Sequence, residues 1–323
     1  MDSLAVILLN YNGSEDTIEC IQSLDKSVTD YTYNIYIVDN DSRSTEKNVL
    51  KDYIKNKIDF EVCDYNMFRK EKIRGNILIL SNENLGFARG NNIVIREIYK
   101  EYSYILLLNN DTVVKEDFIE QMLNLMDNDK NIGFASCRID NYYDHDLLWN
   151  CGGVLRPWGL RKYYSEKDLD KMPYIISAEF ITGCAMFIRS ETIEKHGALS
   201  DDFFHGEEDF NFCWRMKKDH VIGKCINKTL VYHKVNATSK KSGNQPGKMA
   251  GYYAYRIVDM KQFYPRAIWY TWKTLLVKVL KVRWRRLGYT KTDIAKMLNI
   301  VKRTSKLDSI NREETFKIWN LNY

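Results

Sequence analysis

The first part of the chain alternates four times between a short apolar run and a stretch with helical periodicity, and this alternation restricts the fold more than any other feature. Continuous runs of apolar, mostly branched residues are typical of strands that are buried on both faces of a sheet. Four strand–turn–helix units in succession predict a parallel sheet with helices on both faces. The four expected strands are residues 4–9, 35–38, 77–80 and 104–108.

Beyond residue 133 the alternation gives way to shorter, mixed pieces. Residues 236–248 are rich in Asn, Ser, Thr, Lys and Gly, and we expect them to form a loop. The chain after this loop is helical and basic in pattern. We therefore expect an α/β domain over residues 1–250 and a helical C-terminal extension over residues 251–323. The further strands expected before the loop lie near residues 133–137, 179–188 and 221–226.

The composition, with 45% hydrophobic and 28% charged residues over 323 positions, is typical of a soluble globular protein. The seven cysteines include no Cys-x-x-Cys pair, which favours reduced, buried thiols over a disulfide framework or a zinc site. The first residues lack the basic start and the cleavage site of a signal peptide, and no run of 18 apolar residues occurs. These features predict a cytoplasmic protein without a membrane-spanning segment.

Acidic residues occur at strand ends and in one dense cluster. Asp39 and Asp111 each follow an expected strand, and the run Glu207-Glu208-Asp209 follows two phenylalanines. The strand ends on one edge of an α/β sheet are where ligands and chemistry are found. Neighbouring carboxylates raise each other's pKa, which produces a general base that works near neutral pH. The alternative for the cluster alone is a solvated helix start, with acids near the positive end of the helix.

Residues 84–92 form the nearest approach to a glycine-rich phosphate loop, because the chain has no Walker loop, no Gly-x-Gly-x-x-Gly and no nucleophile elbow. The glycines at 86 and 90 would let backbone amides approach a diphosphate, and Arg89 could pair with it. A plain strand-to-helix connection is the alternative for this segment.

Asn109, Asn110 and Asp111 directly follow a very apolar expected strand. An oxygen-rich tip of this kind can hold a hard divalent cation, which in turn binds phosphate oxygens. A helix N-cap is the alternative role for Asp111. His233 follows another strand-like run, where a packed histidine and a ligand are both compatible with the pattern.

Together these features resemble the family 2 glycosyltransferases, and in particular the rhamnosyltransferase-like branch that builds bacterial surface polysaccharides. Six blocks match in order, and they extend over about residues 4–240. The blocks are 6–12 ending in Asn-Tyr-Asn, 38–42 with Val-Asp-Asn and Ser, 84–92 with Asn-Leu-Gly-Phe and Gly-Asn-Asn, 108–112 with Leu-Asn-Asn-Asp-Thr, 180–188, and 208–233 with Glu208-Asp209, Arg215 and His233.

The resemblance implies a GT-A fold, which is a Rossmann-like mixed sheet flanked by helices. It implies that Asp209, with Glu208 beside it, removes the proton from the acceptor hydroxyl. It also implies that Asp111, with His233, holds a divalent cation, Mn²⁺ or Mg²⁺, on the donor diphosphate. The residues that it assigns to the nucleotide-sugar are Asn10, Tyr11, Asn12, Asp39, Asn84, Arg89, Asn91, Asn110 and Asp111.

The sequence departs from the family pattern at three places. The metal motif often has two acidic residues, whereas here only Asp111 is acidic. Asn211 stands where a second aspartate is common. Residues 59–74 have the pattern of an insertion.

The activity that the resemblance implies is an inverting transfer of one sugar from a nucleotide-diphospho-sugar, dTDP-rhamnose or a UDP-hexose. The acceptor would be a hydroxyl of a lipid-linked saccharide in cell-surface polysaccharide synthesis. Two other functions stay open. A sugar-phosphate nucleotidyltransferase would need a glycine-rich, basic loop after the first strand, and residues 10–13 are not one. A non-catalytic, membrane-docked nucleotide-sugar binder is disfavoured by the presence of Asp209 and Asp111.

The C-terminal segment carries more than the whole net charge of +5, with twelve Lys or Arg between 261 and 303 against one acid, Asp293. Tryptophans at 269, 272 and 284 lie among these bases. The pattern predicts a helix at an anionic membrane surface, on the inner face of the cell membrane. Packing against the protein's own domain or in a homodimer is the alternative, and no motif indicates nucleic acid. The apolar face of this expected helix is formed by Ile268, Trp269, Trp272, Leu275, Leu276 and Val279.

Overall fold

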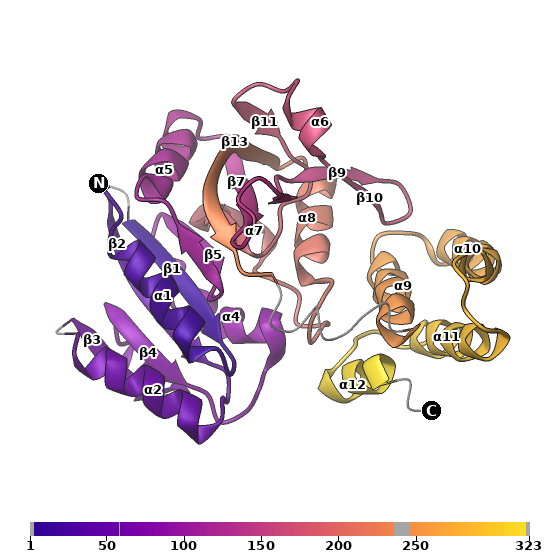
Figure 1. Cartoon of the computed structure of the whole chain (residues 1–323), viewed down its shortest axis with the longest axis horizontal. Coiled ribbons are helices and arrows are strands. Elements are labelled where there is room, and N and C mark those ends of the chain that lie inside the picture. The colour runs from indigo at the N-terminus through magenta and orange to yellow at the C-terminus, as the bar shows by residue number, and fades with distance from the viewer. Residues whose placement is uncertain (1–2, 58, 236–245, 321–323) are drawn as a thin grey trace.

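The computed structural model describes residues 3–57, 59–235 and 246–320 of the chain. It consists of an α/β part around a large mixed sheet and a group of four helices beside it (Figure 1). The strands in these ranges are β1 (Ser3–Asn10), β2 (Thr32–Asp39), β3 (Phe60–Asp64), β4 (Asn76–Leu80), β5 (Tyr104–Asn109), β6 (Thr112–Val114), β7 (Ile132–Asn141), β8 (Leu148–Asn150), β9 (Gly153–Arg156), β10 (Leu160–Tyr163), β11 (Ile175–Ser177), β12 (Ala185–Arg189) and β13 (Ile222–His233).

The helices in the same ranges are α1 (Ser14–Leu24), α2 (Ser44–Lys55), α3 (Tyr65–Glu71), α4 (Gly86–Ile98), α5 (Phe118–Asn128), α6 (Glu166–Leu169), α7 (Ser190–His196), α8 (Glu208–Lys218), α9 (Pro246–Met260), α10 (Arg266–Arg286), α11 (Lys291–Thr304) and α12 (Arg312–Asn320).

The large sheet has the strand order β11-β13-β7-β12-β5-β1-β2-β4-β3, with β6 paired to β13 and β8 to β7. The four strands expected at the start of the chain are β1, β2, β4 and β5, and they pair in parallel as predicted. The second half adds the antiparallel strand β12 between β5 and β7, which makes the sheet mixed. The chain runs outward from β1 in both directions, so that the strand order reverses beside β1.

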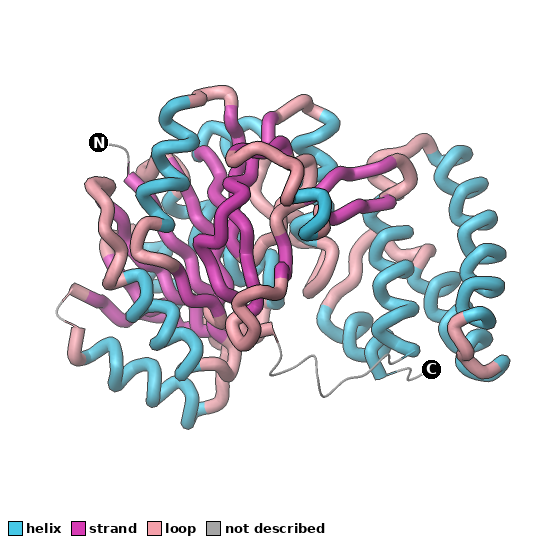
Figure 2. Tube along the Cα trace, turned by 45° about the horizontal axis from the view of Figure 1, so that its top comes forward, coloured by secondary structure: helices cyan, strands magenta, loops and turns pink. Residues whose placement is uncertain are grey.

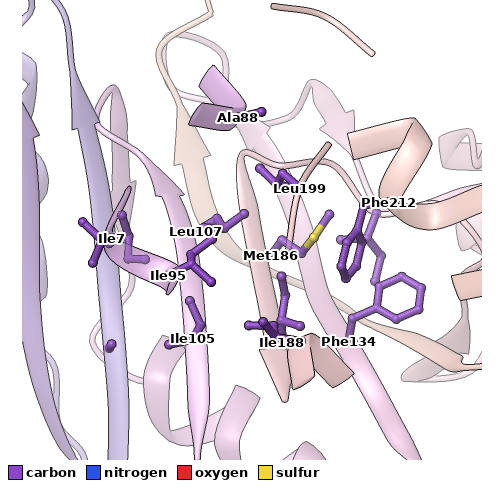
Figure 3. Packing of buried hydrophobic residues seen from close by; sticks show 14 of the residues in the cluster. Ile7, Ala88, Ile95, Ile105, Leu107, Phe134, Met186, Ile188, Leu199 and Phe212 are labelled. Carbon is purple, nitrogen blue, oxygen red and sulfur yellow. The ribbon is translucent and has the colours of Figure 1, made fainter. Parts of the chain in front are cut away.

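Apolar cores cover both faces of this sheet, because successive side chains of a strand point to opposite faces. Leu4, Val6 and Leu8 of β1 pack with residues of α1, α2 and α5. Ala5 and Ile7 pack on the other face with residues of α4, α7 and α8. Figure 3 shows the second of these cores from nearby. The sequence pattern of strands buried on both faces is therefore confirmed.

Several boundaries differ from the expectation. The segment 59–74 forms an edge strand, β3, and the short helix α3, so that the apparent insertion extends the sheet. Helix α4 begins at Gly86, which places most of the expected glycine loop inside a helix. The expected strand over 179–188 begins only at Ala185. Of the expected loop over 236–248, residues 236–245 lie outside the described ranges, and the rest forms the start of α9.

The C-terminal helices form a third apolar core of their own, which includes Trp269, Trp284 and Met297. Phe203, from the loop before α8, also packs into this core. The backbone of the same loop is tied to the helices, because Phe204 N donates to Ile310 O at 2.9 Å. The predicted division at residues 250 and 251 stays a prediction, and the loop before α8 joins the two parts.

The apolar face expected for the C-terminal segment is divided between two sides of α10. Trp269 and Trp284 are buried against α9, where Trp269 Nε1 donates to Ile257 O at 2.9 Å. The prediction that Trp269 lies on a membrane-facing side is wrong, because it packs inside the helical group. Trp284, which was not part of the predicted face, packs there too. Ile268, Leu275 and Val279 point outward instead and are exposed. None of the helices in the described ranges is long and apolar enough to cross a membrane.

The seven cysteines are all buried as free thiols, as the sequence predicted. They are distributed over the α/β part, five in strands and helices and two, Cys151 and Cys184, in the connections before β9 and β12. Burial raises the pKa of the Cys213 thiol and of the Cys184 thiol well above the ordinary range, so that both stay protonated at neutral pH.

Candidate active site

The candidate site lies at the edge of the sheet where β1, β2, β5 and β13 end. Asn10 and Asp39 are the last residues of β1 and β2, and their backbones pair with each other. Asp111 lies between β5 and β6, and His233 ends β13. The strand order reverses beside β1, and this is the position where open α/β sheets bind ligands.

A buried polar network forms the floor of this edge. Asn10 Nδ2 donates to Asp39 Oδ2 at 2.9 Å, and the other Asp39 oxygen accepts from Ser42 N at 3.1 Å. Asn110 Nδ2 donates to Thr17 Oγ1 at 2.9 Å and lies 3.4 Å from Asn10 Oδ1. Asn10 and Asp39 are fully buried. Three residues that the sequence assigned to the nucleotide-sugar, Asn10, Asp39 and Asn110, therefore hold the strand ends together.

Two residues of the first turn have different roles. Tyr11 is 49% exposed, so that its ring is free to contact a ligand above the floor. Asn12 has a φ of 55°, in the left-handed region that asparagine tolerates better than most residues. Its backbone N–H donates to Ser42 Oγ at 2.9 Å, and its side-chain oxygen accepts from Arg43 N at 2.8 Å. Asn12 therefore shapes the turn.

The start of the segment 84–91 is hydrogen-bonded to the side chain of Asn40. Asn40 Nδ2 donates to Asn84 Oδ1 at 3.1 Å, and Asn40 Oδ1 accepts from Leu85 N at 2.8 Å. Asn91 is buried within α4 and donates to Phe87 O, four residues earlier in the helix, at 2.9 Å. The structure does not bring the Asn91 side chain to the edge of the sheet, because α4 begins earlier than the glycines suggested.

Arg89 is exposed, and its Nε donates to Asp201 O at 3.2 Å. It therefore faces the loop before α8 from the first turns of α4. The same loop contacts the start of α4 directly, because Phe87 N donates to Phe204 O at 2.9 Å.

Asp111 and His233, the two residues predicted to hold a metal ion, meet directly at this edge. His233 Nε2 lies 3.0 Å from Asp111 Oδ1, and the Asp111 side chain is 34% exposed. The backbone fixes this pair, because Thr112 pairs with His233 across β6 and β13. An imidazole nitrogen and a carboxylate oxygen are both ligands of divalent cations.

No group of three or more His, Cys, Asp or Glu side chains that could hold a metal ion occurs within the described ranges. Two protein ligands suit a cation such as Mg²⁺, which keeps several waters and takes further oxygens from a substrate phosphate. Asp111 and His233 therefore fit a cation that is shared with a diphosphate. They do not form a closed structural metal centre.

The acidic run begins α8, and its three carboxylates have different surroundings. Glu208 Oε2 accepts from Gly206 N at 2.5 Å and from Glu207 N at 2.8 Å, so that this carboxylate is engaged by its own loop. Glu207 is buried and pairs with Arg161 of β10, whose Nη2 lies 2.9 and 2.7 Å from the two oxygens. The run does start a helix, as the alternative interpretation had it, but Glu207 and Glu208 are buried and Asp209 is only partly exposed.

The carboxylate of Asp209 has a strongly perturbed pKa. Burial, and next the negative charge of Glu208, raise the pKa of Asp209 to about 7. Its two oxygens accept hydrogen bonds from Gly183 N at 3.3 Å and from Phe210 N at 2.8 Å. These bonds orient the carboxylate, while its surroundings keep it poised between the acid and the base form at neutral pH.

The two acid-bearing segments meet at the backbone of residues 183 and 184. Gly183 N donates to Asp209, and Asn109 N donates to Cys184 O at 2.8 Å. Burial, and next the charge of Asp111, raise the pKa of the Cys184 thiol, and the charge of Asp209 adds to this effect. Asp111 and Asp209 therefore both lie near Cys184, although 98 positions of sequence separate them.

Arg215 and Asn211, singled out in the family pattern, have structural contacts. The Arg215 guanidinium donates to the backbone oxygens of His196 and Ala198, and so satisfies the end of α7. Asn211 Nδ2 donates to the fully buried Asp259 of α9 at 2.6 Å. An asparagine at position 211 therefore supplies the hydrogen that a second aspartate could not give to Asp259.

Sequence reasoning missed two charged side chains of the site. Arg161 belongs to a four-residue strand in which apolar and polar residues do not alternate, so that no sequence pattern predicted its position. Lys234 follows His233, and its Nζ lies 2.6 Å from Asp16 and 2.5 Å from Glu19 of α1. The adjacency of Lys234 to His233 was the only signal, and its distant partners were not predictable.

The fold defines the class of protein: this is a GT-A glycosyltransferase fold, with acidic residues at the edge of the sheet where β1, β2 and β5 end. Residues 5–195 match Glycosyl transferase family 2, and residues 104–299 match Glycosyl transferase family group 2. The first match covers more than half of the chain, and the chain belongs to glycosyl transferase family 2.

A curated relative is the low-salt glycan biosynthesis hexosyltransferase Agl10 of Haloferax volcanii. It is 25% identical over 231 residues, which cover 70% of this chain and 65% of that protein. The match therefore leaves more than a third of the relative uncovered.

Among solved structures, GalNAc-T7 with UDP, GalNAc and Mn²⁺ superposes with a TM-score of 0.59 at 15% identity, over 81% of this chain and 48% of that one. The mannosyltransferase PcManGT from Pyrobaculum calidifontis, in complex with GDP-Man and Mn²⁺, gives 0.56 at 12% identity, over 94% and 87%. S. aureus TarS gives 0.52 at 12% identity, over 90% and 44%. At these identities the likeness establishes the fold.

Proposed function

We propose that the chain transfers a sugar from a nucleotide-diphospho-sugar to a hydroxyl group with inversion at the anomeric carbon, and that Asp209 is the general base. The observation that carries this proposal is the surroundings of Asp209: the carboxylate is oriented by two backbone N–H groups, and its pKa is raised to about 7. Family membership supports the reaction class, and the relatives solved with UDP or GDP-Man support the donor class.

In this reaction the acceptor oxygen forms a bond to the anomeric carbon while the bond from that carbon to the diphosphate breaks. The proton of the acceptor hydroxyl passes to Asp209, and the bonding electrons leave with the diphosphate. Asp111 and His233 would hold the divalent cation, which neutralises the charge that develops on the leaving diphosphate. The exposed Tyr11 ring and the Arg89 guanidinium are the side chains proposed to contact the nucleotide part.

The substitution Asp209→Asn tests the base. We expect turnover to fall by about 100-fold or more, while the Kd of the donor changes little. The wild-type rate should rise as pH passes through about 7, because the base must be ionised. Asp219→Asn, at the exposed end of the same helix, is the matched control and should keep full activity.

A panel of nucleotide sugars with Mn²⁺ or Mg²⁺ identifies the donor, with dTDP-rhamnose and UDP-hexoses as the first candidates. Transfer to a saccharide with the opposite anomeric configuration from the donor supports inversion, and retention would contradict it. Undiminished turnover in Asp209→Asn would eliminate Asp209 as the base. Binding of a nucleotide sugar without any transfer or hydrolysis would favour the non-catalytic binder instead.

The metal proposal predicts cooperativity between cation and nucleotide. Since Asp111 and His233 are the two described side chains proposed to hold the cation, Mn²⁺ alone should bind weakly, and a nucleoside diphosphate should tighten its binding. Isothermal titration of Mn²⁺ with and without the nucleotide measures this effect. Asp111→Asn should abolish the enhancement, whereas Asp117→Asn, an exposed acid beyond β6, should preserve it. Equal Mn²⁺ affinity with and without nucleotide would contradict a shared cation.

We further propose that the outer side of α10 contacts an anionic membrane, where a lipid-linked acceptor would be presented. Ile268, Leu275, Val279 and Val282 recur at helical spacing on this side and are exposed. Exposed bases surround them, and each Lys or Arg near an anionic surface contributes about 1 kcal/mol of attraction, which salt screens. These bases are Lys278, Lys281, Arg283, Arg285 and Arg286.

Vesicle sedimentation tests the membrane surface. Binding to phosphatidylglycerol vesicles should weaken, but not vanish, as salt rises, and phosphatidylcholine vesicles should bind little. Val279→Asp places an acid on the outer side of α10 and should reduce binding by about 10-fold. Val28→Asp makes the same change at an exposed valine before β2 and should bind as the wild type does. Equal binding of both variants would contradict this surface.

A further inference from the structure

The β9–β10 hairpin connects the helical group to the acidic run. It forms a two-stranded sheet separate from the large one, and both views show it extending from the α/β part towards α9 and α10 (Figures 1 and 2). Its tip touches the helices, because Trp158 N donates to Tyr264 Oη at 2.8 Å.

The tip has an unfavourable backbone conformation at a bulky residue. Trp158 has a φ of 68°, and the following Gly159 has a φ of 66°. A turn of this shape is normally formed by Asn-Gly or Gly-Gly, because a large side chain is strained at positive φ. The Trp158 ring offsets this strain by stacking, with its centroid 4.9 Å from that of Tyr264 and 6.1 Å from that of Trp272.

Strand β10 of the hairpin reaches the acidic run through Arg161. The side chains of Arg161 and Glu207 are 4% and 2% exposed, so that their ion pair is almost fully removed from water. The Arg161 guanidinium also lies over the ring of Phe210, the residue after Asp209. The Phe210 ring stacks on Phe180 with centroids 4.0 Å apart.

The hairpin is also joined to the segment that hydrogen-bonds Asp209. Gly153 O, at the start of β9, accepts from Glu179 N at 2.9 Å and from Phe180 N at 3.1 Å. The same segment continues to Gly183, which donates to the Asp209 carboxylate. Asp209 is therefore flanked on two sides by groups that the hairpin holds, one on its own helix and one on the segment 179–183.

We propose that the β9–β10 hairpin is a positioning element of the active site, in which Trp158 fixes the hairpin to the helical group and Arg161 holds the start of α8. This inference rests on the proposed role of Asp209 as the base. Arg161 does not touch the reacting atoms in this proposal. It acts on Asp209 through its contacts with Glu207 and Phe210 and through its own positive charge.

The charged groups around Asp209 affect its pKa, so that the pH dependence of kcat can test the proposal. Glu208 and Glu207, on its own helix and its N-cap, raise the pKa of Asp209, and Arg161 from β10 lowers it. The Gly183 N–H from the segment before β12 also lowers it. The other titratable groups that interact with this carboxylate are uncharged at neutral pH: the Tyr163 phenol and the thiols of Cys184 and Cys213.

The pH dependence of kcat separates positioning from general stability. Arg161→Gln should lower kcat at pH 7 by about 10-fold. It should also move the acid limb, which is the pH range where kcat rises as the base ionises, upward by about 1 pH unit, because the substitution removes a positive charge. Glu207→Gln should move the limb downward. The donor KM should change little in both variants. Arg156→Gln, at an exposed arginine of the same hairpin, is the control and should leave the profile unchanged.

The tip is tested by Trp158→Gly, which relieves the positive φ but removes the stacked ring. We expect kcat to fall while the donor KM is unchanged. A wild-type kcat and acid limb in Arg161→Gln would overturn the proposal. If Arg161→Gln does not fold, Glu207→Gln decides, and an unmoved limb there overturns it as well. Activity retained in Asp209→Asn would instead refute the proposed function, which distinguishes the two failures.

Discussion

At the scale of the residue, the raised pKa that suits Asp209 to its proposed role as the base has a cost in stability. Its pKa is about 7 in the folded protein, mainly because burial penalises the charged form. In the unfolded chain an aspartate ionises near pH 4. The folded state therefore holds the Asp209 proton more tightly. This group reduces stability as pH rises from about 4 to about 7, and the full cost remains above that.

The substitution Asp209→Asn should consequently raise the thermal unfolding midpoint at pH 8 relative to the wild type, although it removes turnover. The gain should shrink as the pH is lowered towards 4, where the wild-type carboxyl is protonated in both states. Thermal unfolding of the two proteins at pH 5 and pH 8 measures the difference. An Asp209→Asn protein that is less stable than the wild type at pH 8 would show that this carboxylate has a structural role.

At the scale of the element, the contact between the start of α4 and the loop before α8 closes the site on one side. Gly86 has a φ of 78°, and a Cβ at this position would collide with the backbone oxygen of Phe204. Two independent constraints, a left-handed conformation and a close backbone approach, therefore require glycine here.

Gly86→Ala should destabilise the protein and weaken donor binding, because it separates α4 from the loop before α8. Gly75→Ala is the matched control, since Gly75 also has a positive φ, of 111°, but open space around its Cβ position. Urea unfolding should give a larger loss for Gly86→Ala, by about 1 kcal/mol or more. Equal losses in the two variants would mean that backbone strain alone accounts for the effect.

Elements with a regular pattern were predictable, and those fixed by distant contacts were not. The four parallel strands and the positions of Asp39 and Asp111 at their ends follow from continuous apolar runs. The start of α4 was misplaced, because Gly86 and Gly90 suggested a loop. Gly90 in fact lies inside the helix, where the absence of a Cβ lets α4 approach Leu9 of β1.

The candidate site shows the same division. The sequence indicated Asp209 through its acidic neighbours, but the cause of its perturbed pKa is mainly burial, which depends on the tertiary fold. The sequence did not indicate Arg161 for the same reason, because only the folded hairpin brings it to Glu207. The rhamnosyltransferase-like branch, the acceptor and the homodimer stay predictions.

At the scale of the whole molecule, the helical group is continuous with the catalytic part through its packing. Phe203 lies in the core of the helices, Asp259 of α9 binds Asn211 of α8, and Trp158 stacks on Tyr264. The C-terminal helices therefore support the loop and the helix that carry the acidic run, in addition to any membrane contact.

Truncation after Met260 should thus lower both stability and turnover on a soluble acceptor, because it uncovers α9 and removes the partners of Trp158. Thermal unfolding and transfer assays on the truncated and full-length chains measure these losses. Val279→Asp, which alters only the exposed side of α10, should keep both properties and is the appropriate probe of the membrane. A truncated chain with full stability and turnover would contradict the structural role of these helices.

The buried thiols give the molecule an internal reporter of its own opening motions. Cys184 adjoins the Gly183 N–H that binds Asp209, and Cys213 lies one helical turn beyond Asp209 in α8. A buried, protonated thiol reacts with a disulfide reagent only when the surrounding structure opens transiently. The rate of labelling at these two cysteines therefore records how often the structure around Asp209 opens, and a bound donor that slows this rate is detected without any turnover.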